Sequence, residues 1–339
     1  MSNQAIDFCK KILPRVSRSF ALTIPMLDKE IYLPVLITYL QDRLLDNFED
    51  EISDEDISIA ERKKMMDRVV DLFNPEIEGY QEIASEISQY ASLMPEKSLK
   101  DLTANCIFLR EAYNTMDDNI KRISFSWLVE MNKGMQIYLE KNVRTFNDLD
   151  DYCYYVAGTV GGFLTDLIIY ISGIEKIKID GDNREILRKH FNASGLFLQK
   201  LNLIRDIKKD IENREKHYWP LESLSVSIPV IFKKENQNLA MQTLDKMLDD
   251  LKAHIPSLIS YYNAIPDKFN GYKKFYAVNN ALGLATIEEL DKNPQVFYGY
   301  KPVKVSKLAF LAIIRNPEKI FLKKAEKISP VVMSVTEKD

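Results

Sequence analysis

The sequence has few of the residues that make turns. Its 339 residues include 11 glycines and 13 prolines, and these 24 residues are about 7% of the chain, where an average protein has roughly 12%. An all-β sandwich or barrel places turn residues about every 8 to 12 positions, and a doubly wound α/β chain needs glycine-rich loops between strands and helices. Both classes fit this composition poorly, whereas a chain of long helices fits it well.

The sequence also has few cysteines, no excess of positive charge and no long apolar run. The three cysteines, Cys9, Cys106 and Cys153, lie far apart, which argues against a disulfide framework or a structural zinc site and favours a reducing compartment. Lys and Arg number 46 against 50 Asp and Glu, so no excess of positive charge favours a nucleic-acid partner. Since the chain shows neither a signal-peptide core nor an uninterrupted apolar run of about 18 residues, we expect a cytoplasmic protein, at most peripherally attached to a membrane. We also expect it to be a monomer.

Apolar residues at helical spacing are abundant. They recur with the period of about 3.6 residues that is typical of an amphipathic helix in the segments 28–50, 57–73, 99–115, 119–141, 149–173, 184–212, 238–263 and 272–291. The hydrophobic fraction is 46%, which is enough for a large core at this length. No linker and no repeat divides the sequence, so we predict one all-α domain over residues 1–339.

A basic amphipathic helix is predicted near the end of the chain, at about residues 303–327. Leu308, Phe310 and Leu311 lie there among many lysines. Two interpretations fit this pattern: the helix docks on the bundle with its lysines in water, or it lies on a membrane surface. Its apolar run is too short to span a bilayer.

The end of segment 28–50 carries a cluster of acidic residues. Asp46, Glu49 and Asp50 lie three and four residues apart, so a helix points their carboxylates to the same side. Alone, this pattern fits a solvated acidic surface. If the face turns inward, the charges need neutralising partners, and hard oxygen ligands of this kind select magnesium or manganese.

A second polar stripe follows in segment 184–212. Gln199, Asn202, Asp206 and Asp210 share one helical face and are flanked by apolar residues. Buried amide and carboxylate groups need partners. Two acidic helices facing a common cavity would hold magnesium ions with a substrate diphosphate, and apolar walls would shelter an allylic carbocation from water.

Four motifs in this chain resemble those of the squalene/phytoene synthases, which join two prenyl diphosphates head to head. The motifs are SRSFALTIPML at 17–27, DNFED at 46–50, DDYCYYVAGTVGG at 150–162 and NLIRDIKKD at 202–210. Three further segments are most similar to the squalene synthase branch: GLFLQKLNLIRD at 195–206, YWPLE at 218–222 and ALGLATIEELDKNPQVFYG at 281–299. The resemblance covers most of the chain and implies an isoprenoid-synthase bundle whose central cavity holds two farnesyl diphosphates.

The resemblance also implies roles for individual residues. The magnesium ligands would be Asp46, Glu49, Asp50, Asp206 and Asp210. Tyr152, Tyr39 and Arg43 would take part in catalysis. Substrate contacts would come from Ser17, Arg18, Ser19, Phe20, Arg43, Arg205, Gln199, Asn202, Val156, Gly158 and Gly161, the small residues leaving room for a prenyl chain. NADPH would be held by Asn202, Lys304 and Lys307.

The implied reaction has two stages. One farnesyl diphosphate ionises and is attacked by the double bond of the other, which gives presqualene diphosphate. This product then ionises, rearranges and accepts hydride from NADPH to give squalene. Two departures bear on these stages: Lys209 stands where squalene synthases commonly have Glu, and Ser306 stands where an Arg is usual in the basic segment that binds NADPH.

Other products and roles stay open on the sequence. A related magnesium-dependent synthase without the reduction step would form presqualene diphosphate, dehydrosqualene, hydroxysqualene or phytoene. The same cavity would also serve another prenyl acceptor or a cyclisation. The remaining class is a non-catalytic isoprenoid-binding protein, and the presence of both acidic clusters argues against it.

Overall fold

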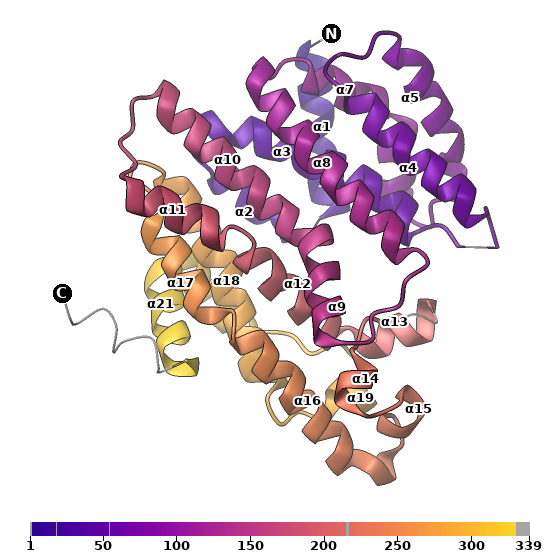
Figure 1. Ribbon diagram of the computed structural model, residues 1–339, viewed down its shortest axis with the longest axis vertical. Coiled ribbons are helices and arrows are strands. Elements are labelled where there is room, and N and C mark those ends of the chain that lie inside the picture. Colours follow the sequence, from indigo (N-terminus) through magenta and orange to yellow (C-terminus); the bar gives the residue numbers. More distant parts are fainter. Residues whose placement is uncertain (1, 18, 54, 215–216, 330–339) are drawn as a thin grey trace. The chain divides into compact units, whose positions relative to one another are not determined.

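The computed structural model describes residues 2–17, 19–53, 55–214 and 217–329 (Figure 1). These residues form helices joined by turns and loops, without a strand, so the predicted all-α class is confirmed. The chain forms two compact units, one of residues 1–141 and 162–178 and the other of residues 142–161 and 179–339. Neither unit is continuous in sequence, which explains why no change of composition marks a boundary.

The first unit is built around a long buried helix, α3. Its helices are α1 (Ser2–Val16), α2 (Phe20–Thr23), the 3₁₀ turn η1 (Ile24–Met26), α3 (Lys29–Asp50), α4 (Ile59–Phe73), α5 (Tyr80–Ser88), the 3₁₀ turn η2 (Gln89–Leu93), α6 (Lys97–Ala104), α7 (Cys106–Tyr113), α8 (Asp118–Tyr138) and most of α10 (Thr159–Ile174). α3 packs against α1, α4, α7 and α8. The Ser58 hydroxyl accepts a hydrogen bond from the Glu61 amide and so caps the start of α4.

The second unit is built around α18, which is buried along most of its length. Its helices are α9 (Phe146–Cys153), the π-helical turn η3 (Tyr154–Gly158), the start of α10, α11 (Gly181–His190), α12 (Ala193–Arg205), α13 (Ile207–Arg214), α14 (Leu221–Leu224), α15 (Ile228–Ile231), the 3₁₀ turn η4 (Lys234–Asn236), α16 (Gln237–Lys252), α17 (Ile255–Ala264), α18 (Asn270–Leu290), α19 (Gln295–Tyr298), α20 (Lys307–Arg315) and α21 (Pro317–Ile328). α18 packs against α12, α17, α20 and α21, and Figure 1 shows α21 lying along it.

Four segments that were predicted as single helices are divided in the structure. They are 99–115, 184–212, 238–263 and the C-terminal segment 303–327. At the first break, the Asn105 Nδ2 donates to the Asp101 carbonyl at 2.8 Å, a local bond that competes with the helix. Pro256 and Pro317 stand in the first turns of α17 and α21, because a proline inside a continuous helix would leave a carbonyl without its amide donor. The prediction of one C-terminal helix is therefore wrong, and α20 and α21 are separate.

Helical structure continues without a break from Phe146 to Ile174, through α9, η3 and α10. By length and composition this stretch is apolar enough to cross a membrane, with a mean hydropathy of 1.4 over its most apolar window, of which 56% is buried. The expectation based on uninterrupted apolar runs missed it because single polar residues interrupt the run. A core helix that is apolar on all sides has the same composition.

The glycines of this stretch lie where a neighbouring segment comes close. A Cβ added to Gly161 would lie 2.0 Å from the carbonyl oxygen of Phe191, and one added to Gly158 would lie 3.1 Å from Leu196 Cδ1. Both neighbours belong to the second unit, as do the two glycines. This differs from the expectation that Gly158 and Gly161 leave room for a prenyl chain, because the space beside each is occupied by protein. Small residues are needed here so that the backbones can approach.

We predict that Gly161→Ala destabilises the protein by about 1–3 kcal/mol, the usual range for an overpacked site, because the added methyl group would meet a backbone carbonyl. Gly173→Ala in the same helix is the matched control, since no atom lies within 4 Å of the added Cβ. Removing that helical glycine should raise stability by up to about 1 kcal/mol. Urea unfolding followed by circular dichroism measures both variants, and equal stabilities would contradict the packing role of Gly161.

Candidate active site

The first acidic motif lies in the last turns of α3. One carboxylate oxygen from each of Asp46, Glu49 and Asp50 lies within 4.8 Å of the other two. Glu49 is buried, with 1% of its surface exposed, and the two aspartates are half-buried. Three acids this close repel one another unless a cation or protons neutralise them. The predicted face of α3 is therefore assembled as a group of hard oxygen ligands, the kind that suits magnesium.

Arg43 lies one turn before this motif and contacts it. Its Nη1 forms an ion pair with Asp46, and its Nη2 donates to Glu51 Oε1 at 2.8 Å. The three-residue spacing places Arg43 and Asp46 on the same face of α3. Burial raises the pKa of Asp42 to about 8, and repulsion from Asp46 adds to this rise. A guanidinium and a protonated carboxyl thus both reduce the negative charge around the motif.

Arg62, which was not among the predicted site residues, holds the end of α3 in place. It is buried on α4, and its Nε and Nη2 donate to the carbonyls of Phe48 and Glu49 at 3.2 and 2.6 Å. The last carbonyls of a helix lack intrahelical donors, and Arg62 supplies two. Its position in the charged run ERKK is indistinguishable in sequence from that of a surface arginine.

The N-terminal motif and Tyr39 lie together in the first unit. The rings of Phe20 and Tyr39 are 5.2 Å apart, and the Ser17 hydroxyl accepts from the Phe20 amide at 3.1 Å. Burial raises the pKa of Tyr39, and a hydrogen bond with Ser17 partly opposes the rise. Ser19 is exposed, and Arg18 lies outside the described residues. Tyr39 precedes Arg43 by one helical turn, so the structure brings two predicted segments to one face of α3.

The second acidic motif spans the junction of α12 and α13. Asp206 ends α12, and the amides of Asp206 and Asp210 donate to the carbonyls four residues earlier, so the helical spacing continues through the junction. The Arg205 guanidinium binds both carboxylate oxygens of Asp206, at 2.9 and 2.5 Å. Gln199 is half-buried and Asn202 is exposed. Arg205 therefore balances the charge of the second motif as Arg43 balances that of the first.

Tyr152 is buried in the second unit against another segment of the predicted motifs. Its ring stacks on that of Tyr218, with centroids 4.2 Å apart and planes 13° from parallel. The next residue, Trp219, donates from Nε1 to the Leu203 carbonyl of α12 at 3.0 Å. Segment YWPLE thus fixes the Tyr152 ring and contacts the helix that leads into the second acidic motif. Val156 lies just beyond, in the π-helical turn, and π-helical turns often occur at functional sites.

The chain is similar to known proteins over most of its length. The family model described as squalene/phytoene synthase matches residues 13–309. The chain belongs to the squalene/phytoene synthase family. The squalene synthases of Bos taurus and Homo sapiens are both 32% identical to it, over 308 and 311 residues, which are 89% and 90% of this chain and 67% and 68% of theirs.

Solved structures agree with this family membership. The structure of TcSQS in complex with the ligand E5700 matches with a TM-score of 0.82 and 26% identity, over 97% of this chain and 91% of that one. A ligand-bound dehydrosqualene synthase matches with a TM-score of 0.61 and 16% identity, over 95% and 98%, which shows a shared fold. As a family member, the chain is a prenyltransferase-type enzyme of isoprenoid biosynthesis.

A buried lysine of this synthase-family chain joins the helix of Tyr152 to that of the second acidic motif. Lys200 on α12 has 1% of its side chain exposed and forms ion pairs with Asp150 on α9 and, at 2.6 Å, with Asp250 on α16. Burial raises the pKa of Asp250, and Lys200 opposes this rise. This triad was not predicted, although the position of Lys200 within the apolar run LFLQKLNLI indicates a buried lysine.

Of the predicted nucleotide contacts, Lys307 is the first residue of α20 and Lys304 lies in the loop before it. Both are exposed. Ser306, which stands where an arginine is usual, accepts a hydrogen bond from the Ala309 amide at 3.2 Å and so caps α20. Two exposed cations suit the phosphates of NADPH, but they do not position a nicotinamide ring.

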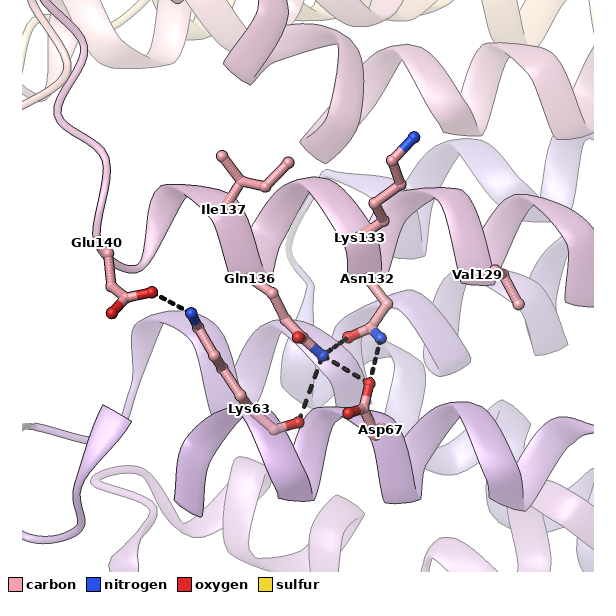
Figure 2. Close-up of a pocket in the computed structure, with 8 residues that line it drawn as sticks. All are labelled: Lys63, Asp67, Val129, Asn132, Lys133, Gln136, Ile137 and Glu140. Atoms are coloured by element: carbon pink, nitrogen blue, oxygen red, sulfur yellow. Dashed lines mark hydrogen bonds and ion pairs between the residues drawn. The ribbon is translucent and has the colours of Figure 1, made fainter. Parts of the chain in front are cut away.

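An open groove in the first unit contains none of the predicted site residues (Figure 2). It lies along α4 and α8. Asp67 accepts hydrogen bonds from Asn132 Nδ2 at 2.9 Å and Gln136 Nε2 at 2.6 Å, and Lys63 forms an ion pair with Glu140. Because these polar groups bind one another, the groove shows no arrangement that suits diphosphate chemistry.

We predict that Lys200→Met destabilises the protein by about 2–4 kcal/mol, because removing the buried lysine leaves the half-buried carboxylate of Asp250 without its counter-charge. The value lies towards the lower end of the range for buried pairs, since Asp150 is partly exposed. Lys252→Met, at a more exposed ion pair on α16, is the matched control and should change stability by less than about 0.5 kcal/mol.

The loss of stability caused by Lys200→Met should also depend on pH. Without the ammonium group, the pKa of Asp250 in the folded state rises further above its unfolded value. The variant is therefore less stable at pH values where Asp250 is ionised than at pH values where it is protonated. The loss relative to wild type should therefore be full at neutral pH and shrink as pH falls through that raised pKa. Denaturant unfolding across this pH range measures it, and a deficit that does not change with pH would argue against the ion pair.

Proposed function

We propose that the protein condenses two molecules of farnesyl diphosphate to presqualene diphosphate in a magnesium-dependent reaction. The observation that carries the proposal is the carboxylate group of Asp46, Glu49 and Asp50, whose ligand oxygens lie within 4.8 Å of one another. A chain of this family that had lost the reaction would have no need to keep three mutually repelling acids together. Similarity to squalene synthases of animals supports farnesyl diphosphate as the substrate.

Magnesium fits the residues present. Asp46, Glu49 and Asp50 would hold it at the first motif, and Asp206 and Asp210 would do so at the second. Bound there, magnesium neutralises the charge of a departing diphosphate. Glu49 is the most buried of the ligands, so a divalent cation would relieve the unfavourable burial of its charge.

The chain's own side chains would bind and orient the substrates. Arg43 and Arg205 each pair with an aspartate of one motif, which supports the proposal that both would contact diphosphate oxygens next to that motif. The half-buried Tyr39 and Phe20 rings would exclude water and stabilise positive charge on an allylic carbon through their faces. Tyr152, held by stacking on Tyr218, would accept the proton lost on cyclopropane closure at its Oη, or direct it to the released diphosphate.

We further propose that presqualene diphosphate is reduced to squalene with NADPH, bound through Asn202, Lys304 and Lys307. Similarity to the squalene synthase branch supports this second stage. One observation favours a second candidate, a synthase without the reduction: position 306 carries a helix-capping serine in place of a phosphate-binding arginine. The two candidates differ only in the product formed when the nucleotide is supplied.

Product analysis is expected to separate the two candidates. Purified protein with farnesyl diphosphate and magnesium should release pyrophosphate and accumulate presqualene diphosphate without NADPH, and should yield squalene when NADPH is added. Mass spectrometry of the extract identifies the products, and a parallel reaction with geranylgeranyl diphosphate tests chain length. Absence of squalene with NADPH would overturn the reduction, and absence of any condensation product from either substrate would overturn the proposed reaction.

Asp50→Asn and Asp206→Asn should each lower magnesium-dependent pyrophosphate release at least about 100-fold, since each removes an anionic ligand whose contribution is several kcal/mol. Glu55→Gln is the matched control: this acid is exposed and lies just beyond the first motif, so its loss should leave the rate within about twofold. Far-ultraviolet circular dichroism checks that all three variants fold. Undiminished turnover in either aspartate variant would refute the ligand assignment.

A further inference from the structure

The two C-terminal helices differ in how much of their surface is covered. α21 docks on the second unit: Phe321 and Ala325 are buried, and Lys324 and Lys327 both form ion pairs with Glu288 of α18. α20 buries only Ile313 fully. Within one stretch of basic amphipathic sequence, α21 is therefore covered by the second unit, whereas most of the surface of α20 is not covered by protein.

The uncovered face of α20 is apolar. Leu308 and Leu311 are 82% and 62% exposed, and they share a face with the exposed Ala312. Tyr300, separated from this helix by residues 301–306, is fully exposed. These are the three most exposed large hydrophobic side chains of the described residues, and all lie between positions 300 and 311. Single exposed apolar residues are normal, but a cluster of them marks an interaction site.

Positive charge surrounds this apolar face. From residue 292 to residue 317 the sequence contains no Asp or Glu, although acids outnumber bases in the chain as a whole. The bases of this stretch are Lys292, Lys301, Lys304, Lys307 and Arg315, and the four beyond residue 300 are exposed. Leucines that enter the acyl boundary, a tyrosine at the headgroup level and flanking lysines are the composition of a helix that lies on a membrane surface.

We propose that the exposed face of α20, formed by Leu308, Leu311 and Arg315 and preceded by the exposed Tyr300 and Lys301, docks on an anionic lipid bilayer. Charge complementarity selects this occupant, because a basic rim is attracted to anionic headgroups. A second copy of the chain would bring the same positive charges together, and three apolar side chains offer less than the roughly 800 Å² per partner of a standard protein interface. The proposal goes beyond the proposed reaction and does not depend on it.

Co-sedimentation with lipid vesicles tests the proposal on the full-length protein. Wild-type protein should pellet with vesicles that contain phosphatidylglycerol, pellet weakly with vesicles of phosphatidylcholine alone, and be released by high salt. The variant L308Q/L311Q should bind the anionic vesicles at least about tenfold more weakly, because it loses the apolar contacts. Leu239→Gln, at an exposed leucine of α16, is the matched control and should bind like wild type.

Several outcomes would overturn the proposal. They are a wild-type protein that stays in the supernatant with anionic vesicles, a variant that pellets like wild type, and a wild-type dimer in light scattering that L308Q/L311Q converts to a monomer. The last result would show that this face binds a second copy. Because sedimentation needs no turnover, these results are independent of whether the proposed condensation takes place.

Discussion

Negative charge concentrated at the carboxyl end of a helix is the constraint on which the first unit depends. The C-terminus of a helix already carries partial negative charge, and α3 adds three carboxylates there within 4.8 Å of one another. Arg62 binds the last carbonyls of α3, and Arg43 binds the carboxylate of Asp46. These arginines reduce the electrostatic repulsion at the end of α3. The remaining group of acids is of a kind that a divalent cation stabilises further.

In the second unit the charge that needs a partner is positive, because a lysine is buried in its core. Lys200 is accessible to almost no water, yet it lies between two acids from different helices. A buried ion pair adds little net stability compared with apolar packing, so its consequence here is geometric. It fixes α9, which carries Tyr152, against α12, which leads into Asp206. Both acidic motifs are therefore positioned by charges in the packed core, and flexible loops are not required to place them.

Patterns with a short period could be predicted from the sequence, and contacts between distant segments could not. The spacing of Asp46, Glu49 and Asp50 follows from helical periodicity alone, and so does the all-α class. The partners of Arg62 and Lys200 could not be predicted because they lie 13 residues or more away in the chain. Of the two, only Lys200 lies in an apolar run that indicates burial. The motif resemblance predicted roles for individual residues, which periodicity alone does not. It explained Gly158 and Gly161 by room for a substrate, whereas in the structure a neighbouring segment lies beside each glycine.

The end of the chain shows why hydrophobic periodicity leaves such choices open. α20 and α21 are both basic and amphipathic, and their sequences gave one prediction with two interpretations. Phe321 reaches the rings of Tyr262 and Tyr276, with centroids 5.4 and 6.1 Å away, whereas Leu308 reaches no such pocket. An apolar stripe indicates that one face of a helix is covered, but it does not identify what covers it. That depends on which surfaces remain exposed after the core has formed. For α21 the core supplies that partner, and for α20 the surrounding charge favours a lipid surface.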